Sequence, residues 1–252
     1  RQFGAGRTAS TFAEVANACD AAIVLTPARL HHRMALDALE AGCHVLCEKP
    51  LAESAGKVDE IIATAHAAGR SVAVNNTRRL APANRLVRDL IASGALGEIR
   101  AIEYVLGEPF DWPSAGDGYF GVKAGGRGIV ADIGAHVLDL ASWWLGGDLD
   151  LVAYRDDAAG GTEAVADIRF ARGTAGGHVR LSWLSKLGNR YTVRGTRATL
   201  EGEVYDAHTV TIVDGGRRTK RRADGPGEFA ALGRLVIDNF LDVVQRGATP
   251  LV

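Results

Sequence analysis

The stretch "AAIVLTPARLHHRMALDALEAGCHVLCEKP", residues 21–50, contains an apolar run, a helical segment and a second apolar run. Residues 21–27 are a continuous apolar run closed by Thr-Pro, which is typical of a strand buried on both faces. Residues 29–41 have apolar side chains on one side and Gly42 as a stop, so they predict a helix. Residues 43–47, "CHVLC", predict a second strand. A strand, a helix and a strand in this order indicate two parallel strands joined by a right-handed crossover.

The same alternation of strand and helix continues on both sides of this stretch. Residues 54–69 have a helical pattern that ends on Gly69, and residues 71–75, "SVAVN", predict a third strand. Thr11 and Glu14 have the spacing of a capping box, which predicts a short helix before the first strand. Three strands connected through helices predict a parallel sheet, and therefore an α/β unit in this part of the chain.

The pattern of apolar residues changes after a further helix at residues 82–94, which begins on Pro82 and ends on Gly94. Beyond it, apolar and polar residues alternate in short segments separated by Gly, Asp and Asn, which is typical of half-buried strands. A helix at residues 128–145 interrupts them. The segments are 97–108, 149–155, 163–171, 175–185, 189–195, 197–204 and 208–213. The sequence therefore predicts a mostly antiparallel sheet of about six or seven strands, in an α+β domain that follows the α/β unit.

The composition excludes several classes of protein. Of the 252 residues, 47% are hydrophobic and 23% are charged, as in an average globular protein. The formal net charge of −1 gives no basic surface for nucleic acid, and the basic run at residues 217–222 is interpreted as a solvated loop. No apolar segment reaches the roughly 20 residues that span a membrane. Cys19, Cys43 and Cys47 have no paired metal spacing, and Cys43 and Cys47 lie four apart on a predicted strand, too far for a disulfide, so we expect no metal site and a cytoplasmic location.

Polar residues follow two of the predicted buried strands. The first strand ends on Thr26-Pro27 and leads into a helix with His31 near its start, and the second ends on Glu48-Lys49-Pro50. Ligands of open parallel sheets bind at the carboxyl ends of the strands. A lysine placed there is partly shielded from water, which makes Lys49 a candidate catalytic group. A Glu–Lys turn on the surface remains the alternative.

The helix at residues 129–145 is apolar nearly all the way round, so we expect it to be buried. Within it, Asp132, His136 and Asp139 recur at positions i, i+4 and i+7 and share one face. A carboxylate one turn before a histidine can orient the imidazole, so Asp132 and His136 are candidates for a general base with its orienting acid. Gly134 is expected to leave room for a ligand to approach the helix. A buried Asp–His pair that satisfies only itself is the alternative.

Three weaker signals accompany these. Arg78 and Arg79 follow the third predicted strand and are candidates for substrate contact, with solvated surface arginines as the alternative. Residues 124–128, "AGGRG", precede the apolar helix, whose N-terminus could then face an anionic or hydroxyl-rich ligand. Residues 4–9 mimic the Gly-x-Gly-x-x-Ala spacing of a dinucleotide fingerprint, but only three residues precede them, so we interpret them as a chance match.

Three segments, taken together and in this order, resemble the Gfo/Idh/MocA oxidoreductases, the family of glucose–fructose oxidoreductase and inositol dehydrogenase. Residues 21–54 are similar to the Thr-Pro…His…Glu-Lys-Pro region of that family. Residues 75–103, "NNTRRLAPANRLVRDLIASGALGEIRAIE", are similar to its crossover segment into the second domain. Residues 125–146, "GGRGIVADIGAHVLDLASWWLG", are similar to its Gly-Gly…Asp-x-Gly-x-His…Asp helix. The likeness runs along most of the chain.

The resemblance implies a fold and an activity. The fold is α/β plus α+β, with a partial Rossmann parallel sheet followed by a mostly antiparallel open sheet. Residues 1–78 are then the C-terminal portion of a dinucleotide-binding domain, and residues 79–252 are a substrate-binding domain whose sheet forms a homo-oligomer. The implied activity is that of an NAD(P)-dependent dehydrogenase acting on a secondary hydroxyl of a sugar, cyclitol or related polyol. The cofactor is NAD or NADP, the partner is a small-molecule substrate, and neither nucleic acid nor a membrane is expected.

The resemblance also implies roles for individual residues. Lys49 matches the lysine beside nicotinamide and substrate, and Asp132 and His136 match the catalytic Asp and His, although which of Lys49 and His136 takes the proton stays open. The expected cofactor-binding residues are Thr26, Pro27, His31, Glu48, Lys49 and Pro50. The expected substrate-binding residues are Arg78, Arg79, Asp132 and His136.

One feature of the family is missing from these 252 residues. The glycine-rich phosphate loop that precedes the Thr-Pro region has no counterpart in them, so we expect an N-terminally truncated or partial sequence. A relative without catalytic activity, which senses a dinucleotide or a sugar, or an inactive partial chain is the alternative to an enzyme.

Overall fold

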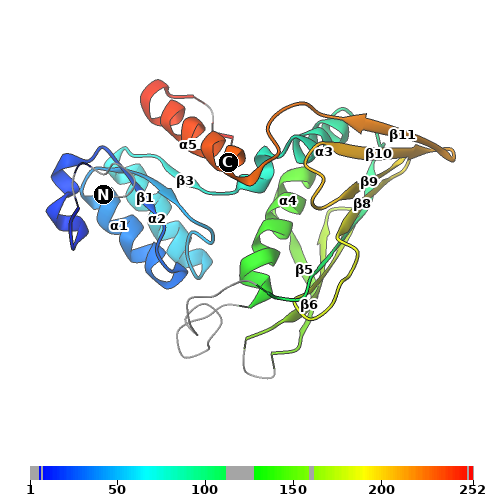
Figure 1. The fold of residues 1–252 in the computed structure, drawn as a ribbon, viewed down its shortest axis with the longest axis horizontal. Helices are drawn as coiled ribbons and strands as arrows, with labels where there is room; N and C mark the ends of the chain where they lie inside the picture. Colours follow the sequence, from blue (N-terminus) through cyan, green and yellow to red (C-terminus); the bar gives the residue numbers. More distant parts are fainter. Residues whose placement is uncertain (1–5, 7, 112–127, 159–161, 249, 252) are drawn as a thin grey trace. The chain divides into compact units, whose positions relative to one another are not determined.

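The structure is a computed structural model that describes residues 6, 8–111, 128–158, 162–248 and 250–251. The chain divides into two compact units, Arg1–Asn76 with Gly233–Val252, and Thr77–Leu232 (Figure 1). The domain boundary predicted between residues 78 and 79 stays a prediction, because the two compact units do not test the functions that it assigns to the two parts.

The first unit contains a parallel three-stranded sheet in the order β1-β2-β3, as the sequence predicts. Two helices connect these strands, and part of a third helix, α5, belongs to this unit as well. The Thr11–Glu14 capping box is present and opens a short 3-10 turn at Phe12–Glu14. The elements are β1 (Ala21–Val24), α1 (His31–Glu40), β2 (His44–Cys47), α2 (Ala55–Ala68), β3 (Val72–Val74) and α5 (Phe229–Arg246).

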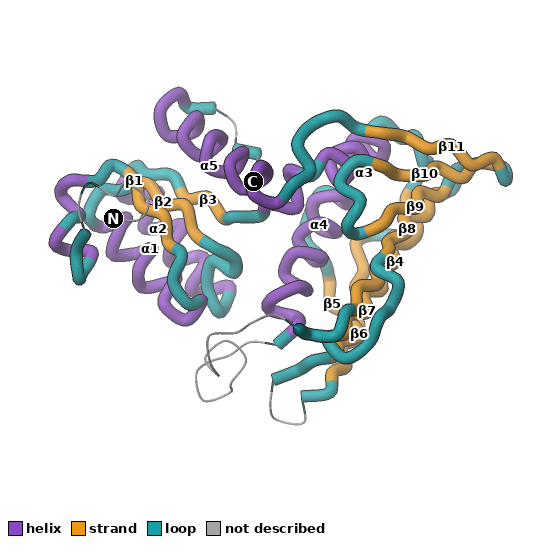
Figure 2. Tube along the Cα trace, in the orientation of Figure 1, coloured by secondary structure: helices purple, strands orange, loops and turns teal. Residues whose placement is uncertain are grey.

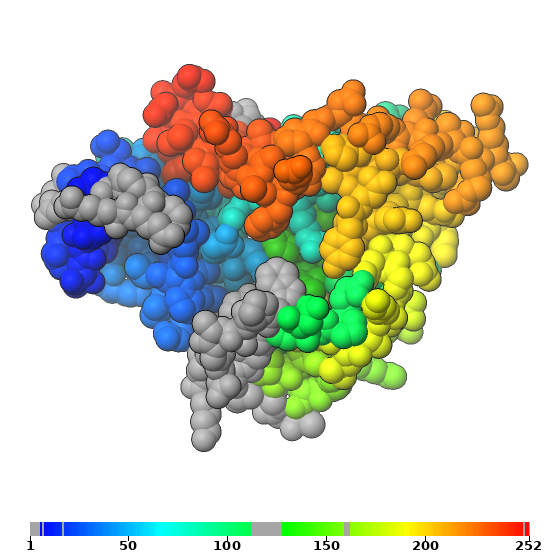
Figure 3. Space-filling model, viewed as in Figure 1, coloured from blue at the N-terminus to red at the C-terminus, as the bar shows by residue number. Residues whose placement is uncertain are grey.

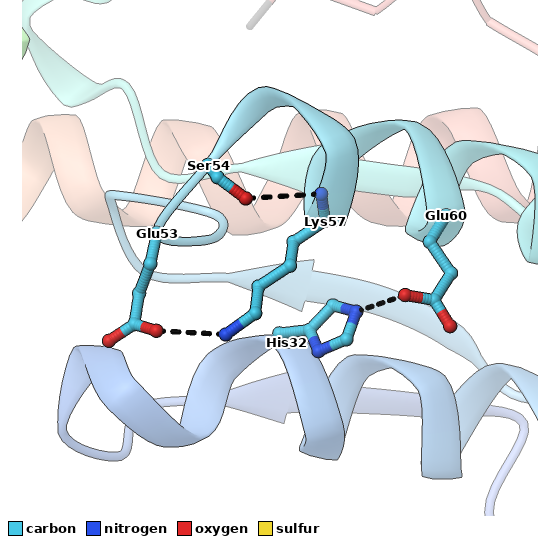
Figure 4. Close-up of polar contacts among 5 residues, drawn as sticks. All are labelled: His32, Glu53, Ser54, Lys57 and Glu60. Carbon is cyan, nitrogen blue, oxygen red and sulfur yellow. Dashed lines mark hydrogen bonds and ion pairs between the residues drawn. The ribbon is translucent and has the colours of Figure 1, made fainter.

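Helices α1 and α2 pack against each other, and polar side chains join them at the surface (Figure 4). The Ser54 hydroxyl accepts a hydrogen bond from the Lys57 amide and caps α2, and Gly69 ends that helix at φ 62°. His32 Nε2 lies 2.8 Å from Glu60 Oε2, and Lys57 Nζ lies 2.9 Å from a carboxylate oxygen of Glu53. Such exposed pairs contribute about 0–1 kcal/mol each, so the apolar contacts beneath them hold the two helices together.

The first strand is not buried on both faces, which corrects the prediction. Val24 is 4% exposed, but Ile23 is 48% exposed and Leu25, just beyond the strand, is 69% exposed. The strand stands at the edge of the three-stranded sheet, and α1 covers the face that Val24 points to. A continuous apolar run shows that both faces can be buried, but it does not show that a second layer covers them.

The second unit contains an eight-stranded sheet in the order β11-β10-β9-β8-β4-β7-β6-β5. Neighbouring strands are antiparallel except β4 and β7, so the predicted mostly antiparallel sheet is confirmed. Helices α3 and α4 supply side chains to the core on one face of the sheet, and α4 lies along that face in Figure 2. The elements are α3 (Pro82–Ala92), β4 (Ile99–Gly107), α4 (Ala135–Leu145), β5 (Asp150–Asp156), β6 (Val165–Arg172), β7 (Ala175–Ser182), β8 (Arg190–Gly195), β9 (Thr199–Glu203), β10 (Thr209–Asp214) and β11 (Arg217–Arg222).

The basic run at residues 217–222 is a strand rather than the solvated loop that its composition suggested. It forms β11, the edge strand next to β10, and it is exposed on the surface in orange in Figure 3. Arg218 Nη2 lies 2.5 Å from a carboxylate oxygen of Glu201 on β9. Because neither face of β11 is buried, its sequence lacks the alternation of apolar and polar residues that marks a half-buried strand. The signal that predicts it is the Asp-Gly-Gly turn at residues 214–216.

The predicted helix at residues 128–145 begins with a π turn, Val130–Gly134, that continues into α4. The amide of Ala135 donates to the carbonyl of Val130, five residues earlier. A Cβ added to Gly134 would lie 3.3 Å from Leu181 Cδ1 on β7. The side chain of Leu181 on the sheet of this unit therefore occupies the space beside this glycine.

Among the described residues, we find no helix that combines the length and the apolar character needed to cross a membrane.

Candidate functional site

Polar side chains meet where the three parallel strands of the first unit end. Glu48 follows β2 directly, and Asn75 follows β3. Asn75 Nδ2 donates to Glu48 Oε1 at 2.5 Å, and the amide of Lys49 lies 3.2 Å from Glu48 Oε2. The Glu48 carboxylate is therefore oriented by Asn75 and holds the backbone at Lys49. Asn75 was not predicted, although its position after a third parallel strand is a usable signal.

His31 lies beneath these strand ends with 1% of its surface exposed. Its Nδ1 lies 2.7 Å from the carbonyl oxygen of Pro50, and its Nε2 lies 2.7 Å from the carbonyl oxygen of Thr26. Carbonyl oxygens only accept hydrogen bonds, so both contacts are hydrogen bonds at once only when both ring nitrogens carry a proton. The imidazole thus links the segment after β1 to the segment after β2.

Two buried polar atoms at this edge have no hydrogen-bond partner within the described part of the chain. They are Thr26 Oγ1, two residues after β1, and Asn75 Oδ1, one residue after β3. An unpaired buried polar atom costs roughly 1–3 kcal/mol, so such atoms at a strand edge indicate a place where a polar ligand can bind. Their chemistry fits the hydroxyl and amide groups of a dinucleotide.

Cys47 closes β2 one residue before Glu48, and its thiol is inert in the folded protein. The residue is 0% exposed, and burial raises the pKa of the thiol to about 12, with the charge of Glu48 acting in the same direction. We expect iodoacetamide at pH 8 to leave Cys47 unmodified in the folded chain, because the reactive thiolate is scarce and inaccessible. Peptide mass spectrometry measures this, with the guanidinium-unfolded chain as the control. Rapid alkylation of Cys47 without denaturant would contradict the burial.

In the second unit, Asp132 lies in the π turn and His136 lies in the first turn of α4, and both are partly buried. The start of this helix is held by Glu163, which the sequence did not single out. Glu163 Oε1 accepts a hydrogen bond of 3.1 Å from the Val130 amide. A carboxylate at a helix N-terminus is stabilised by the unpaired amides and the dipole there. Gly128 is needed for this contact, because a Cβ on it would overlap the Glu163 carboxylate.

The two arginines after β3 are both engaged within the second unit. Arg79 donates to both carboxylate oxygens of Asp139, with Nε at 2.8 Å and Nη2 at 2.5 Å. Arg78 Nη1 lies 3.3 Å from the hydroxyl of Tyr104 on β4. Neither arginine is therefore the solvated surface residue that the sequence left as the alternative. Asp139 was grouped with Asp132 and His136 by its spacing, and the structure gives it an arginine partner.

The predicted site residues fall into two groups. Thr26, Pro27, His31, Glu48, Lys49 and Pro50 lie in the first unit, and Arg78, Arg79, Asp132 and His136 lie in the second. Of the weaker signals, residues 124–127 and residues 4, 5 and 7 lie outside the described residues. A cavity of about 650 Å³ in the second unit is lined by other residues, among them Asp206, His208 and Glu228.

Comparison with protein families gives two matches that together cover most of the chain. Residues 1–76 match a model described as an oxidoreductase family with an NAD-binding Rossmann fold. Residues 84–201 match a model described as the GFO/IDH/MocA C-terminal domain.

Two curated relatives have related activities. A 1,5-anhydro-D-fructose reductase of Ensifer adhaerens is 30% identical over 226 residues, which are 83% of this chain and 63% of the relative. A D-glucoside 3-dehydrogenase of Escherichia coli K12 is 38% identical over 133 residues, which are 50% of this chain and 36% of that protein. The chain thus spans less than two thirds of the length of either relative.

Solved structures confirm the predicted fold class. An oxidoreductase from Agrobacterium radiobacter, in complex with NAD+, L-tartaric acid and magnesium, superposes with a TM-score of 0.84 at 21% identity. That match covers 99% of this chain and 77% of the other. An aldose–aldose oxidoreductase from Caulobacter crescentus, complexed with glycerol, gives a TM-score of 0.83 at 23% identity and covers 96% of this chain and 74% of that one.

Proposed function

Because the chain belongs to the Gfo/Idh/MocA family of NAD-binding oxidoreductases, we propose that it transfers a hydride between NAD or NADP and a secondary hydroxyl of a sugar, cyclitol or related polyol. The observation that carries the proposal is the edge of the parallel sheet in the first unit, where the Thr26 hydroxyl and the Asn75 amide oxygen are buried without a partner among the described residues. An NAD-binding family and a polar strand edge of this kind support the same conclusion.

The residues proposed to hold the dinucleotide are those at this edge. Thr26, Pro27, Glu48 and Pro50 line it by their positions after the strands, and Asn75 joins them as an addition from the structure. When bound, the nicotinamide supplies the hydride acceptor or donor. We assign His31 to positioning, because its two ring nitrogens face backbone carbonyls.

The proposed proton chemistry uses one group from each unit. His136 removes the proton of the substrate hydroxyl, and Asp132 orients its imidazole. The Lys49 ammonium donates a hydrogen bond to the same substrate oxygen and stabilises its developing negative charge. In the reducing direction, His136 returns the proton.

The activity is tested by following NADH and NADPH absorbance with myo-inositol, D-glucose and 1,5-anhydro-D-glucitol, and in the reverse direction with 1,5-anhydro-D-fructose. Turnover with one cofactor and at least one of these compounds supports the enzyme. Binding of NAD or NADP in a calorimetric titration, without turnover on a broad panel of polyols, would favour the sensing relative. Absence of both binding and turnover would contradict the proposal for this chain.

Replacing Thr26 by valine tests the cofactor site through stability as well as binding. Valine has the shape of threonine without the hydroxyl, so the variant removes a buried unpartnered oxygen. We expect the ligand-free chain to gain about 1 kcal/mol of unfolding free energy and the dinucleotide to bind roughly 5- to 10-fold more weakly. Thermal melting and titration with NAD and NADP measure the two effects. Thr77→Val, at a threonine that is 3% exposed in the other unit, is the control; equal binding by Thr26→Val would remove Thr26 from the site.

The homo-oligomer is likewise a proposal, and β5 supports it. All seven residues of this edge strand are exposed, among them Leu151 at 67%, Val152 at 64% and Tyr154 at 42%. Apolar side chains gathered on an unpaired edge strand favour association. We expect Leu151→Glu to shift the chain toward monomer in sedimentation velocity. A wild-type chain that stays monomeric at tens of micromolar would contradict this.

A further inference from the structure

Asp139 lies on α4, three residues after His136, and it forms an ion pair with Arg79. Residues three apart on a helix are neighbours on its surface, so Asp139 and His136 occupy the same side of α4. The guanidinium meets the carboxylate in a fork of two hydrogen bonds, from Nε at 2.8 Å and from Nη2 at 2.5 Å. This bidentate geometry fixes the orientation of both side chains, which a single point contact does not.

The pair is shielded from water more than the other arginine–carboxylate pairs that the structure describes. The Arg79 and Asp139 side chains are 24% and 18% exposed, whereas those of Arg218 and Glu201 are 60% and 41% exposed. Partial burial strengthens the attraction and makes the loss of one partner costly, because the remaining charge keeps its desolvation without compensation.

Further contacts attach the same short segment to the same helix. Arg79 belongs to a 3-10 turn, Thr77–Leu80, and its guanidinium carbon lies 5.8 Å from the ring centre of Trp143, one turn beyond Asp139. Arg88 on α3 lies 4.5 Å from the same ring. Trp143 is thus contacted by two guanidinium groups, and each cation–π contact adds roughly 0.5–2 kcal/mol.

Asn84 on α3 makes two further contacts, one to the 3-10 turn and one to α4. The Asn84 side chain donates to the Arg78 carbonyl at 2.8 Å, and the Asn84 carbonyl accepts from Trp144 Nε1 at 3.0 Å. Both arginines of the 3-10 turn, Arg78 and Arg79, therefore connect this turn to α4. Arg79 makes the link that is nearest to His136 along the helix.

We propose that Arg79 and Asp139 form a positioning pair, which fixes α4 against the turn at residues 77–80 and thereby orients His136. This inference rests on the proposed function, in which His136 moves the proton of the substrate. It changes the role of Arg79 from substrate contact to positioning, because Nε and Nη2, the two donors along one edge of its guanidinium, are already used by Asp139. A misplacement of the base by a fraction of an ångström lowers the rate of the chemical step more than the affinity for substrate.

The experiment compares Arg79→Met, Arg79→Lys, the single substitutions Arg79→Asp and Asp139→Arg, and the exchanged pair that combines these two, all in the full chain. Arg218→Met is the matched control. Amide hydrogen exchange by mass spectrometry follows peptides that cover residues 130–145. Steady-state kinetics use the compound of the sugar and cyclitol panel with the highest wild-type turnover. Circular dichroism and melting show that each variant folds.

For Arg79→Met we expect roughly 10-fold faster exchange in residues 130–145 and a kcat lowered by about 10- to 100-fold, with KM for substrate within about 3-fold of the wild type. Arg79→Lys keeps the charge without the fork and should recover only part of kcat. The exchanged pair should recover more than either of its single substitutions. Arg218→Met should change neither measurement by more than about 2-fold, because its ion pair is exposed.

Two results would overturn the inference. Unchanged exchange in residues 130–145 for Arg79→Met would show that the pair does not fix the helix. A raised KM with an unchanged kcat would return Arg79 to direct substrate contact. Absence of turnover in the wild-type chain would refute the proposed function instead, and the exchange measurement would still decide whether the pair holds α4.

Discussion

Replacing His136 by asparagine is expected to lower kcat roughly 100- to 10,000-fold, the usual effect of losing a general base. The chain should still fold, because the apolar face of α4 consists of other residues, Val137, Leu140 and Trp144, which are 1–3% exposed. KM for the dinucleotide should stay within about 3-fold, since the substitution removes a group that acts on the proton of the substrate. Initial rates of NADH or NADPH formation on the most active panel compound measure the effect.

Lys49→Met provides the companion measurement from the other unit. The ammonium is proposed to stabilise negative charge on the substrate oxygen, so its loss should lower kcat about 100- to 1,000-fold. Lys57→Met is the control, because Lys57 forms a surface ion pair with Glu53 at 2.9 Å and should be replaceable with little effect. Near-normal kcat in both His136→Asn and Lys49→Met would rule out the proposed catalytic pair.

Gly177→Ala is expected to destabilise the second unit strongly, while Gly176→Ala, one residue earlier on β7, is expected to be tolerated. A Cβ on Gly177 would lie 2.0–2.3 Å from three ring carbons of Phe170 on the neighbouring strand. Phe170 is 3% exposed in the core, so its ring has little space to move into. Overpacking of this kind costs about 1–3 kcal/mol or more. A Cβ on Gly176 would meet nothing within 4 Å.

Differential scanning calorimetry compares the two glycine variants directly. For a unit of this size, each kcal/mol corresponds to roughly 2–4 °C in Tm, so Gly177→Ala should lower Tm by about 5 °C or more. Gly176→Ala should change Tm by no more than about 2 °C, because alanine replaces a flexible residue at an open position. Equal Tm values for both variants would show that the packing of Phe170 on Gly177 is looser than the distances indicate.

The parallel strands, their helices and the antiparallel strands other than β11 could be predicted, because their apolar residues recur with a clear period. Ser54 and Gly69 mark the ends of α2 as N-cap and left-handed C-cap, and the structure uses both as such. The strand β11 was not predicted, because five of its six residues are basic and no apolar residue indicates a buried face. The exposure of Ile23 was missed because it depends on what covers the sheet, which local sequence does not encode.

For the candidate site, the sequence pattern indicated residue types, and the roles assigned to them stay predictions. Lys49, Asp132 and His136 could be singled out by their positions after a strand and along an apolar helix. Asn75, which orients Glu48, was not predicted although it follows a parallel strand, and Glu163, which holds the start of the helix that carries His136, gave no signal because its partner lies 33 residues away. The Asp139 partner of Arg79 could not be predicted for the same reason, because the two residues lie 60 positions apart.

The π turn at Val130–Gly134 has a consequence for the direction of Asp132. A regular α-helix advances by about 100° per residue, and the bond from Ala135 back to Val130 encloses one residue more than an α turn does. Residues before the turn are therefore rotated by about 100° around the helix axis relative to an uninterrupted helix, while Leu140 and Trp144 stay fixed in the core. Asp132 lies within this turn, so the direction of its carboxylate depends on the number of residues that the turn contains. Loss of a single residue there would redirect it without changing the chemistry of any side chain.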